Sequence, residues 1–316
     1  SCSTSLSRVL FLLEKQGNSS AKDNLKIFKG DIRDKKLLNE IFDQYAQNNI
    51  PIKATIHFAG LKAVSESVDK PLSYWQVNVA GSLNLFDIMK EFECNNIVFS
   101  SSATVYSQSN STLSEKSNVL PINPYGKTKA AVENILKDIS ESKSANWNIV
   151  NLRYFNPCGA HPSGLIGENP KGLPNNLFPI ICNVASGKQK TLKIYGKDWD
   201  TKDGTCIRDY IHVMDLAESH IKALEFIQNQ DKLNITFNVG TGRGTSVLDF
   251  INTFEKTNQC KLRYEFTSRR EGDSNNIVAN VALINSFLNW KSKLSLEDIC
   301  RDGWNWYTKN PEGYFE

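Results

Sequence analysis

The sequence of 316 residues predicts an α/β fold, in which a doubly wound parallel sheet is followed by a smaller C-terminal domain. Over residues 1–155, short apolar runs alternate with segments of helical spacing, a pattern typical of parallel sheets. Beyond this point the texture changes, because four prolines and four glycines fall within residues 156–176. These observations predict one domain over residues 1–155 and a second over 156–316, with some segments of the second returning to the first.

The first domain is expected to alternate strands and helices. Asp34 is a good N-cap ahead of apolar residues at helical spacing, which predicts a helix over 35–47. Period-two alternation predicts a strand over 53–58, with Ile56 and Phe58 on one face. The other elements expected here are strands over 25–28, 97–101 and 147–155 and helices over 83–92 and 130–139.

The second domain is expected to mix shorter elements, which suits a small domain beside the sheet. Its expected strands are 192–195, 235–239 and 262–266, and its expected helices are 213–227 and 247–255. The chain contains no internal repeat and no low-complexity tract.

Composition excludes several classes of partner. The 37 Lys and Arg against 34 Asp and Glu leave a net charge of +3 without clustering, so we expect no nucleic acid. No apolar run approaches the ~18 residues that a membrane span needs, so we expect no membrane. The seven cysteines form no CxxC pair, which favours a reducing, cytoplasmic compartment. Cys158 and His161 have a metal-like spacing but no second pair completes a site, so we expect no metal.

Polar and small residues are expected at the ends of several strands. Tyr125 and Lys129 are four residues apart on one helical face, where an ammonium favours tyrosinate and lets a phenol of pKa ~10 act as a general base. Ser102 and Thr104 place hydroxyls at the sheet edge that faces ligands, and Gly60 allows close backbone approach. Taken alone, the Tyr–Lys pair also fits a solvated helix face, and the serines fit a turn that closes a strand. His57, in an apolar strand, is expected to be a hydrogen-bonded core histidine.

Nine phrases follow one another along almost the whole chain: GDIRD (30–34), HFAGLKAVSES (57–67), SSSATVY (100–106), NPYGKTK (123–129), LRYFNPCGAHPSG (152–164), PNNLFP (174–179), GTCIRDYIHVMDLA (204–217), SVLD (246–249) and RREGD (269–273). Each phrase alone is weak, but the ordered set is specific. It resembles the extended short-chain dehydrogenase/reductase family, and within it the epimerases that act at carbon 4 of a UDP-sugar.

The resemblance implies that the chain interconverts UDP-glucose and UDP-galactose through a 4-keto intermediate with bound NAD. Tyr125 would take the proton from the sugar 4-hydroxyl, Ser102 with Thr104 would orient the 4-oxygen, and Lys129 would bind the nicotinamide ribose and lower the tyrosine pKa. The implied NAD contacts are Asp31, Ile32, Phe58, Ala59, Gly60, Leu61, Lys62, Asn78, Ser102, Tyr125, Lys129 and Phe155. The implied contacts to the UDP-sugar substrate are Asn156, Asn176, Leu177, Lys193, Tyr195, Arg208, Arg270 and Asp273. The resemblance also implies a homodimer formed through the helices around 83–92 and 125–140.

One departure from the family concerns the cofactor's pyrophosphate. The family carries a glycine-rich strand, turn and helix ahead of the GDIRD phrase, and this sequence shows none. A Rossmann-like sheet without its central first strand is expected to be incomplete, and the chain as written is expected neither to hold NAD nor to fold stably. The Gly-rich run over 240–244 superficially fits such a turn, but Thr245 occupies the third glycine position, which favours a turn of the substrate domain.

Other functions stay open at this point. One is a different sugar-nucleotide epimerase or a 4,6-dehydratase of the same superfamily, although a dehydratase commonly has Asp-Glu where this chain has Ala103 and Thr104. Another is a truncated, non-catalytic relative or a gene fragment, which the absent glycine turn favours and the retained Ser102 and Tyr125 disfavour. Ile277 stands where family members differ in bulk beside the sugar, so the range of accepted sugars stays open.

Overall fold

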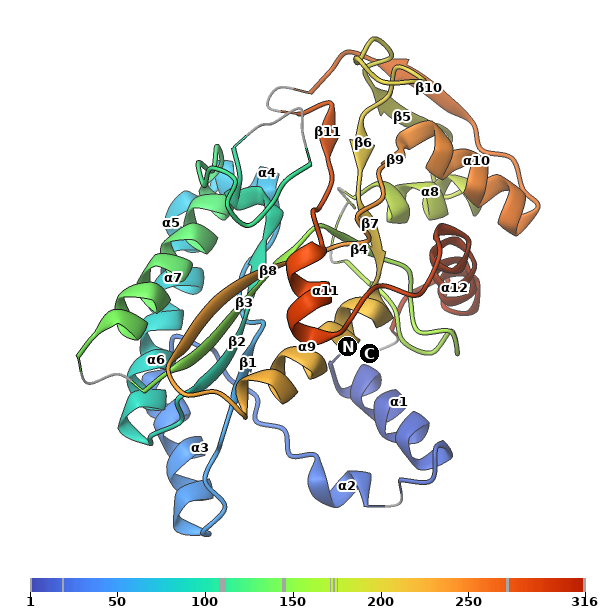
Figure 1. Cartoon of the computed structure of the whole chain (residues 1–316). Helices are drawn as coiled ribbons and strands as arrows, with labels where there is room; N and C mark the ends of the chain where they lie inside the picture. Colours follow the sequence, from blue (N-terminus) through green and yellow to red (C-terminus); the bar gives the residue numbers. More distant parts are fainter. Residues whose placement is uncertain are drawn as a thin grey trace.

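A four-stranded parallel sheet organises the chain, with β1 (Thr55–His57), β2 (Asn96–Ser102), β3 (Asn148–Tyr154) and β8 (Leu233–Val239) in the spatial order β1-β2-β3-β8 (Figure 1). The computed structural model describes residues 2–18, 20–107, 112–143, 146–170, 172, 174, 176–270 and 273–314. Each neighbouring pair of strands is parallel. The carboxyl ends of the strands therefore meet at one edge, where open α/β sheets bind ligands.

Helices cover both faces of this sheet (Figure 1). One face carries α3 (Lys35–Gln47), α6 (Gly81–Glu91) and α7 (Pro124–Glu141), which enclose an apolar core with β2 and β3. The other face carries α9 (Val213–Ile227) and α11 (Ala282–Leu288) over a second core. Because both faces are covered, β2 and β3 are buried almost throughout.

The part of the chain beyond residue 156 builds three small sheets and three further helices. β4 (Asn156–Cys158) pairs with β7 (Tyr210–His212), β5 (Leu192–Tyr195) pairs with β10 (Tyr264–Thr267), and β6 (Ile207–Arg208) lies between β9 (Thr245–Ser246) and β11 (Asn276–Ile277). The helices are α8 (Leu177–Ala185), α10 (Val247–Asn258) and α12 (Leu296–Lys309), and they share an aromatic core with β5 and β7. The division at residue 156 stays a prediction, since β8, α9 and α11 return to the large sheet.

The remaining described elements are short or lie at the start of the chain: α1 (Cys2–Lys15), α2 (Ala21–Asn24), α4 (Val64–Asp69), α5 (Pro71–Tyr74), the π-helix η1 (Trp75–Ala80) and the 3₁₀ turn η2 (Ala103–Val105). Of these, α4, α5 and η1 follow β1 and lead into α6.

Local sequence signals located most elements correctly. The expected bounds of α3, α9 and β5 are confirmed, and the side chain of Asp34 accepts a hydrogen bond from the Leu37 N–H at 3.0 Å, as an N-cap does. The strand predicted over 25–28 is wrong, because these residues form no strand. A strand needs a neighbour for its backbone groups, and residues 25–28 pair with no strand: β1 is the edge strand of the described sheet, and its one partner is β2. Phe28 instead packs edge-on against Tyr45 of α3, with 6.3 Å between ring centroids.

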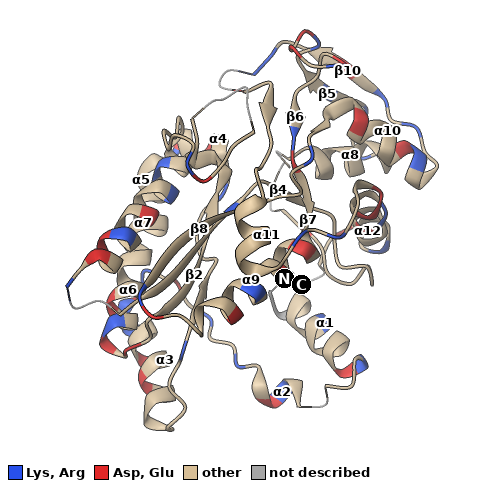
Figure 2. Cartoon of the chain, viewed as in Figure 1, with Lys and Arg blue, Asp and Glu red and all other residues tan. Residues whose placement is uncertain are grey.

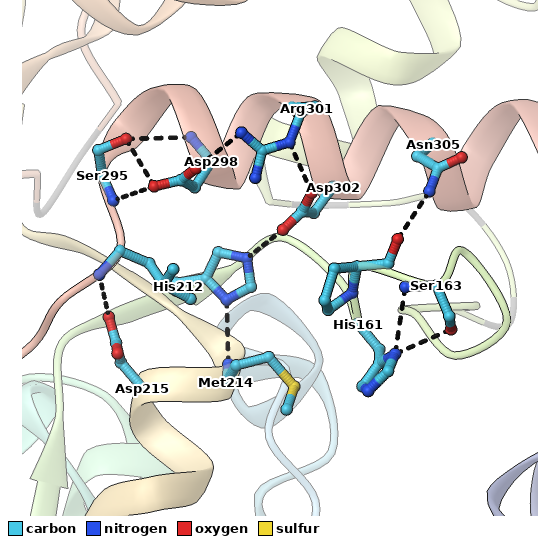
Figure 3. Close-up of polar contacts among 12 residues, drawn as sticks. His161, Ser163, His212, Met214, Asp215, Ser295, Asp298, Arg301, Asp302 and Asn305 are labelled. Atoms are coloured by element: carbon cyan, nitrogen blue, oxygen red, sulfur yellow. Dashed lines mark hydrogen bonds and ion pairs between the residues drawn. The ribbon is translucent and has the colours of Figure 1, made fainter. Parts of the chain in front are cut away.

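A polar junction joins α9 to α12 (Figure 3). His212 ends β7 and caps α9, because its Nδ1 accepts a hydrogen bond from the Met214 N–H at 3.1 Å. Its Nε2 faces the Asp302 carboxylate of α12 at 3.4 Å. Asp215, in the first turn of α9, accepts from the Leu294 N–H at 2.9 Å just before α12 begins. These contacts hold α12 against α9, which covers one face of the large sheet.

Charge is spread over the surface. Figure 2 shows basic and acidic residues on the same helices, for example on α7 and α10, in keeping with the net charge of +3. Among the residues that the structure describes, no helix is long and apolar enough to cross a membrane.

Candidate active site

The predicted catalytic residues meet at the carboxyl edge of the large sheet. Ser102 ends β2, and its hydroxyl accepts hydrogen bonds from the Thr104 N–H at 3.2 Å and the Thr104 hydroxyl at 3.0 Å. α7 begins beside this turn. The side chain of Asn123 caps the helix by accepting a hydrogen bond from the Gly126 N–H at 2.8 Å. Any side chain at Gly126 would place its Cβ 2.5 Å from the Thr104 carbonyl oxygen, so only glycine permits this approach. Tyr125, in the first turn of α7, is thereby brought to the Ser102 hydroxyl.

Lys129 lies one turn further along α7 and is only 5% exposed. Its Nζ donates to the Ser100 carbonyl oxygen at 2.6 Å. It also lies 4.9 Å from the ring centroid of Phe99 and 5.9 Å from that of Tyr125. Burial lowers the pKa of Lys129 to about 8, while Glu133 raises it. The side chain is therefore a mostly protonated ammonium at neutral pH, and it has further N–H groups besides the one that Ser100 accepts.

The tyrosine differs from the expectation. Burial raises the pKa of Tyr125 above its ordinary value, and the hydrogen bond with Ser102 lowers it only in part. The prediction that Lys129 lowers this pKa is therefore wrong for the protein without ligands. The physical reason is that the phenol is enclosed by packed groups, while the ammonium is directed toward the Ser100 carbonyl.

The segment that follows β1 is held by Asn78 of η1. The Asn78 Oδ1 accepts from the Leu61 N–H at 2.7 Å, and its Nδ2 donates to the Leu61 carbonyl at 3.0 Å. Gly60 passes so close that a Cβ there would lie 3.0 Å from Asn78 Oδ1. Phe58 stays 58% exposed at this edge although it is large and apolar, and its ring centroid lies 4.8 Å from that of His220. Gly60 also lies beside the buried ammonium, since a Cβ there would be 3.8 Å from Lys129 Nζ, so the backbone is open to a ligand at this point.

The other predicted cofactor contacts lie around this segment. Lys62 forms an exposed ion pair with Glu168 at 3.3 Å. Phe155 is buried directly after β3. Asp31 pairs with Arg33, which lowers the Asp31 pKa to about 2, and Ile32 packs closely against Gly81, one turn beyond Asn78. Ala59 lies between Phe58 and Gly60 in the same stretch.

His57 lies at the end of β1, in the apolar core beneath the site. It is buried, and its Nε2 lies 2.8 Å from the Ser82 hydroxyl. Burial lowers its pKa to about 3, so the ring is neutral. The prediction of a hydrogen-bonded core histidine is confirmed.

Cys158 and His161 serve separate purposes. Cys158 is buried in the core around α8 and α12, whereas His161 Nδ1 contacts the Ser163 hydroxyl of its own loop at 2.8 Å (Figure 3). Among the described residues no group of three His, Cys, Asp or Glu side chains is arranged to hold a metal ion.

Several predicted substrate residues gather around one carboxylate. Asp273 lies 3.5 Å from Arg208 Nη2 and 3.8 Å from Arg270 Nε. The Arg270 guanidinium stacks 3.9 Å from the ring centroid of Tyr195 on β5. Lys193 stands two residues earlier, on the same side of that strand. The arrangement offers two guanidinium groups and an aromatic ring, which suits an anionic nucleotide.

The three other predicted substrate residues are placed separately. Asn156 begins β4, and its N–H donates to the Asp209 carbonyl at 2.9 Å. Asn176 is the residue before α8, and Leu177 opens that helix and packs on its core. Two parts of the quoted phrases, Asn175 and the pair Glu271 and Gly272, lie outside the described residues.

Asp209 is the residue that sequence reasoning missed. It is fully buried, and its carboxylate accepts from the Thr241 N–H at 2.8 Å, the Thr241 hydroxyl at 2.7 Å, the Gly242 N–H at 2.9 Å and the Ala279 N–H at 3.2 Å. The N–H groups of Thr241 and Gly242, in the turn after β8, therefore bind Asp209 and cannot hold a phosphate. This excludes the dinucleotide interpretation of Gly240–Gly244. The position of Asp209 next to Arg208, a predicted substrate residue, was the signal in the sequence that could have identified it.

A cavity of about 220 Å³ lies elsewhere, between α8 and α12. Phe178 and Cys182 line it from α8, and Trp306 and Tyr307 line it from α12. It contains none of the predicted catalytic or nucleotide residues. The predicted catalytic residues lie instead at the polar edge of the large sheet.

Comparison with known proteins adds to this geometry. A family model described as GDP-mannose 4,6 dehydratase matches residues 3–303. The chain is 47% identical over 295 residues to UDP-glucose 4-epimerase 1 of Oryza sativa subsp. japonica, a match that covers 92% of this chain and 82% of that protein. It is 45% identical over 315 residues to UDP-glucose 4-epimerase 2 of Arabidopsis thaliana, with 99% and 87% covered.

Solved structures are similar as well. The structure of UDP-glucose-4-epimerase from Stenotrophomonas maltophila with bound NAD and formylated UDP-arabinopyranose superposes with a TM-score of 0.86 at 41% identity, covering 90% of this chain and 83% of that one. The enzyme from Bifidobacterium longum in complex with NAD+ and UDP gives 0.82 at 43% identity, with 91% and 84% covered. These comparisons give no support to the expectation of an inactive chain.

Proposed function

Because the chain belongs to the UDP-glucose 4-epimerase family of extended short-chain dehydrogenases/reductases, we propose that it interconverts UDP-glucose and UDP-galactose with NAD as cofactor. The observation that carries the proposal is the meeting of Tyr125, Ser102 and Lys129 at the carboxyl edge of the sheet. Reversible oxidation of a sugar hydroxyl needs groups that orient the oxygen and move its proton. The Ser102 and Thr104 hydroxyls, the Lys129 ammonium and the Tyr125 phenol are such groups.

Each side chain has a defined task in this reaction. Tyr125 accepts the proton of the sugar 4-hydroxyl, and Ser102, supported by Thr104, orients the 4-oxygen. A bound NAD would supply a reversible hydride acceptor at carbon 4, and return of the hydride to the opposite face of the sugar would invert that centre. Lys129 would donate to the nicotinamide ribose, and an ammonium held there beside the phenol would favour the tyrosinate, an effect that is absent from the protein without ligands.

The proposed NAD contacts are those implied by the resemblance. Asn78 holds the backbone at Leu61, Gly60 lets the cofactor approach the chain, and the exposed Phe58 becomes covered on binding. The remaining proposed contacts are Asp31, Ile32, Ala59, Lys62, Ser102, Tyr125, Lys129 and Phe155.

The diphosphate of the UDP-sugar is proposed to bind between Arg208 and Arg270. Both arginines lie near Asp273, but the Arg270 contact is long, at 3.8 Å, so a diphosphate can draw this fork away from the carboxylate. Tyr195 supports Arg270 through the stacked guanidinium. Asn156, Asn176, Leu177, Lys193 and Asp273 complete the proposed set.

The test is product analysis after incubation of the protein with NAD and UDP-glucose. Formation of UDP-galactose, with no net reduction of NAD, is expected. A 4-keto-6-deoxy product would instead identify a dehydratase, and absence of any conversion would contradict the proposal. UDP-N-acetylglucosamine and UDP-xylose assayed alongside UDP-glucose define the range of sugars accepted beside Ile277.

A homodimer through α6 and α7 is proposed as the working assembly. Leu83 of α6 is 43% exposed on the outer side of this layer, where a second copy would cover it. The change Leu83→Glu is expected to shift the protein from dimer to monomer in sedimentation velocity, because it buries a charge in the interface. Leu120→Glu, at an exposed leucine outside these helices, is the control that should stay dimeric. A wild-type monomer would contradict the proposal.

A further inference from the structure

Glu133 is a buried carboxylate on the catalytic helix that the proposed reaction does not use. It lies on α7 one turn beyond Lys129 and two turns beyond Tyr125, and it is only 9% exposed. Spacing of four residues places successive side chains on one face of a helix. The carboxylate is therefore on the same side of α7 as the proposed base and its ammonium.

Two strands of the large sheet hold this carboxylate. From β3, Arg153 donates through Nε to Glu133 Oε1 at 2.9 Å and through Nη2 to Oε2 at 2.6 Å. From β2, the Ser101 hydroxyl donates to the same carboxylate in a short hydrogen bond. Ser101 directly precedes Ser102 in β2. A planar fork and a hydroxyl from two neighbouring strands hold the helix through directional contacts.

Arg153 has further contacts besides Glu133, so its other polar groups are not left without partners. It is 5% exposed, its guanidinium lies 4.7 Å from the ring centroid of Tyr106, and Nη1 donates to the Glu115 carbonyl at 3.4 Å. A buried ion pair is costly unless its remaining groups are satisfied, and these contacts satisfy them. Because a buried ion pair is costly, we infer that Glu133 and Arg153 have a role other than stabilising the fold.

The charges around Lys129 indicate what this role is. The titratable groups that bear on Lys129 and Tyr125 are His57 on β1, Tyr74 on α5, Tyr154 on β3, and Glu133 on α7 itself. Of these, Glu133 is the carboxylate, and it raises the pKa of Lys129 against the effect of burial. His57 is neutral, and the tyrosines have raised pKa values.

We propose that Glu133 is a positioning residue of this site: clamped by Arg153 and Ser101, it sets α7 so that Tyr125 meets Ser102, and its charge keeps Lys129 an ammonium. The role in the reaction rests on the proposed function. The role toward Lys129 does not, because it is present in the protein without ligands.

The first test is a titration of Lys129 in the ligand-free protein. Lysine side chains labelled with ¹³C at Cε are followed by NMR between pH 6 and 11, and the resonance lost in Lys129→Met identifies the residue. Glu133→Gln is expected to lower the Lys129 midpoint by about one pH unit or more, because a carboxylate within one helical turn is removed. An unchanged midpoint would overturn the proposal.

Matched variants separate charge from fold. Glu141→Gln removes an exposed carboxylate from the same helix and should leave the Lys129 midpoint unchanged. Glu133→Gln leaves a buried arginine unpaired and can fail to fold, so the double variant Glu133→Gln with Arg153→Met provides a charge-balanced alternative. The double variant also removes the arginine charge, so its Lys129 midpoint should lie between those of Glu133→Gln and the wild type, and a midpoint above that of the wild type would overturn the proposal.

Glu133→Asp tests the positioning part. It keeps the charge but shortens the reach to Arg153, so the Lys129 midpoint should stay near that of the wild type. In the enzyme assayed with NAD, kcat should fall about tenfold or more while KM for UDP-glucose holds, because the base and Ser102 are misaligned. A wild-type kcat, or a midpoint shift equal to that of Glu133→Gln, would overturn this part. Failure of the wild type to epimerise would contradict the proposed function and leave the titration result intact.

Discussion

Replacing Tyr125 with Phe is expected to lower kcat for formation of UDP-galactose by about 10²- to 10⁴-fold. The change removes the only proton-accepting atom of this side chain and keeps its ring, which packs edge-on against Tyr74 at 6.5 Å between centroids. Binding of UDP should be unchanged, because the nucleotide is proposed to rest on Arg208 and Arg270. The measurements are steady-state kinetics and calorimetric titration with UDP.

Tyr74→Phe is the matched control for that experiment. The Tyr74 hydroxyl donates to the Ala63 carbonyl at 2.7 Å and lies 3.2 Å from a Glu66 carboxylate oxygen. Its loss should cost about 1 kcal/mol of unfolding free energy and leave kcat within a few-fold of the wild type. A Tyr125→Phe variant as fast as Tyr74→Phe would refute the assignment of the base.

Replacing Asp209 with Ala is expected to lower the free energy of unfolding by about 3 kcal/mol or more. The change leaves four donors without their acceptor, on Thr241, Gly242 and Ala279, and opens a space where a fully buried carboxylate stood. Because Arg208 precedes Asp209 on the chain, loss of the clamp should also raise KM for UDP-glucose roughly tenfold. Denaturant unfolding and steady-state kinetics measure the two effects.

Two further variants make this prediction specific. Asp209→Asn keeps one acceptor oxygen but turns an amide N–H₂ toward two donors, so its loss of stability should lie between those of the wild type and the alanine variant. Asp231→Asn, at an exposed aspartate, should change neither stability nor KM. If Asp209→Ala were as stable as Asp231→Asn, the turn after β8 would be held by other contacts.

Residues near in sequence made most of the fold predictable. The N-cap at Asp34 and the apolar spacing after it located α3, and short apolar runs located β2 and β3. The phrases also named Tyr125, Lys129 and Ser102, which the structure brings to one edge of the sheet. Such signals are local, since capping, helical spacing and strand alternation depend on residues only a few positions apart.

The sequence by itself determined the alternation of elements, the family, and the order of residues at the proposed site. Only the tertiary structure decided that residues 25–28 form no strand, that burial raises the Tyr125 pKa, and that Asp209 holds the turn after β8. It alone joined Glu133 to Arg153, which stand 20 positions apart in the chain. The physical reason is that strand pairing, desolvation and buried ion pairs depend on which distant segments pack together, and no local pattern records that choice.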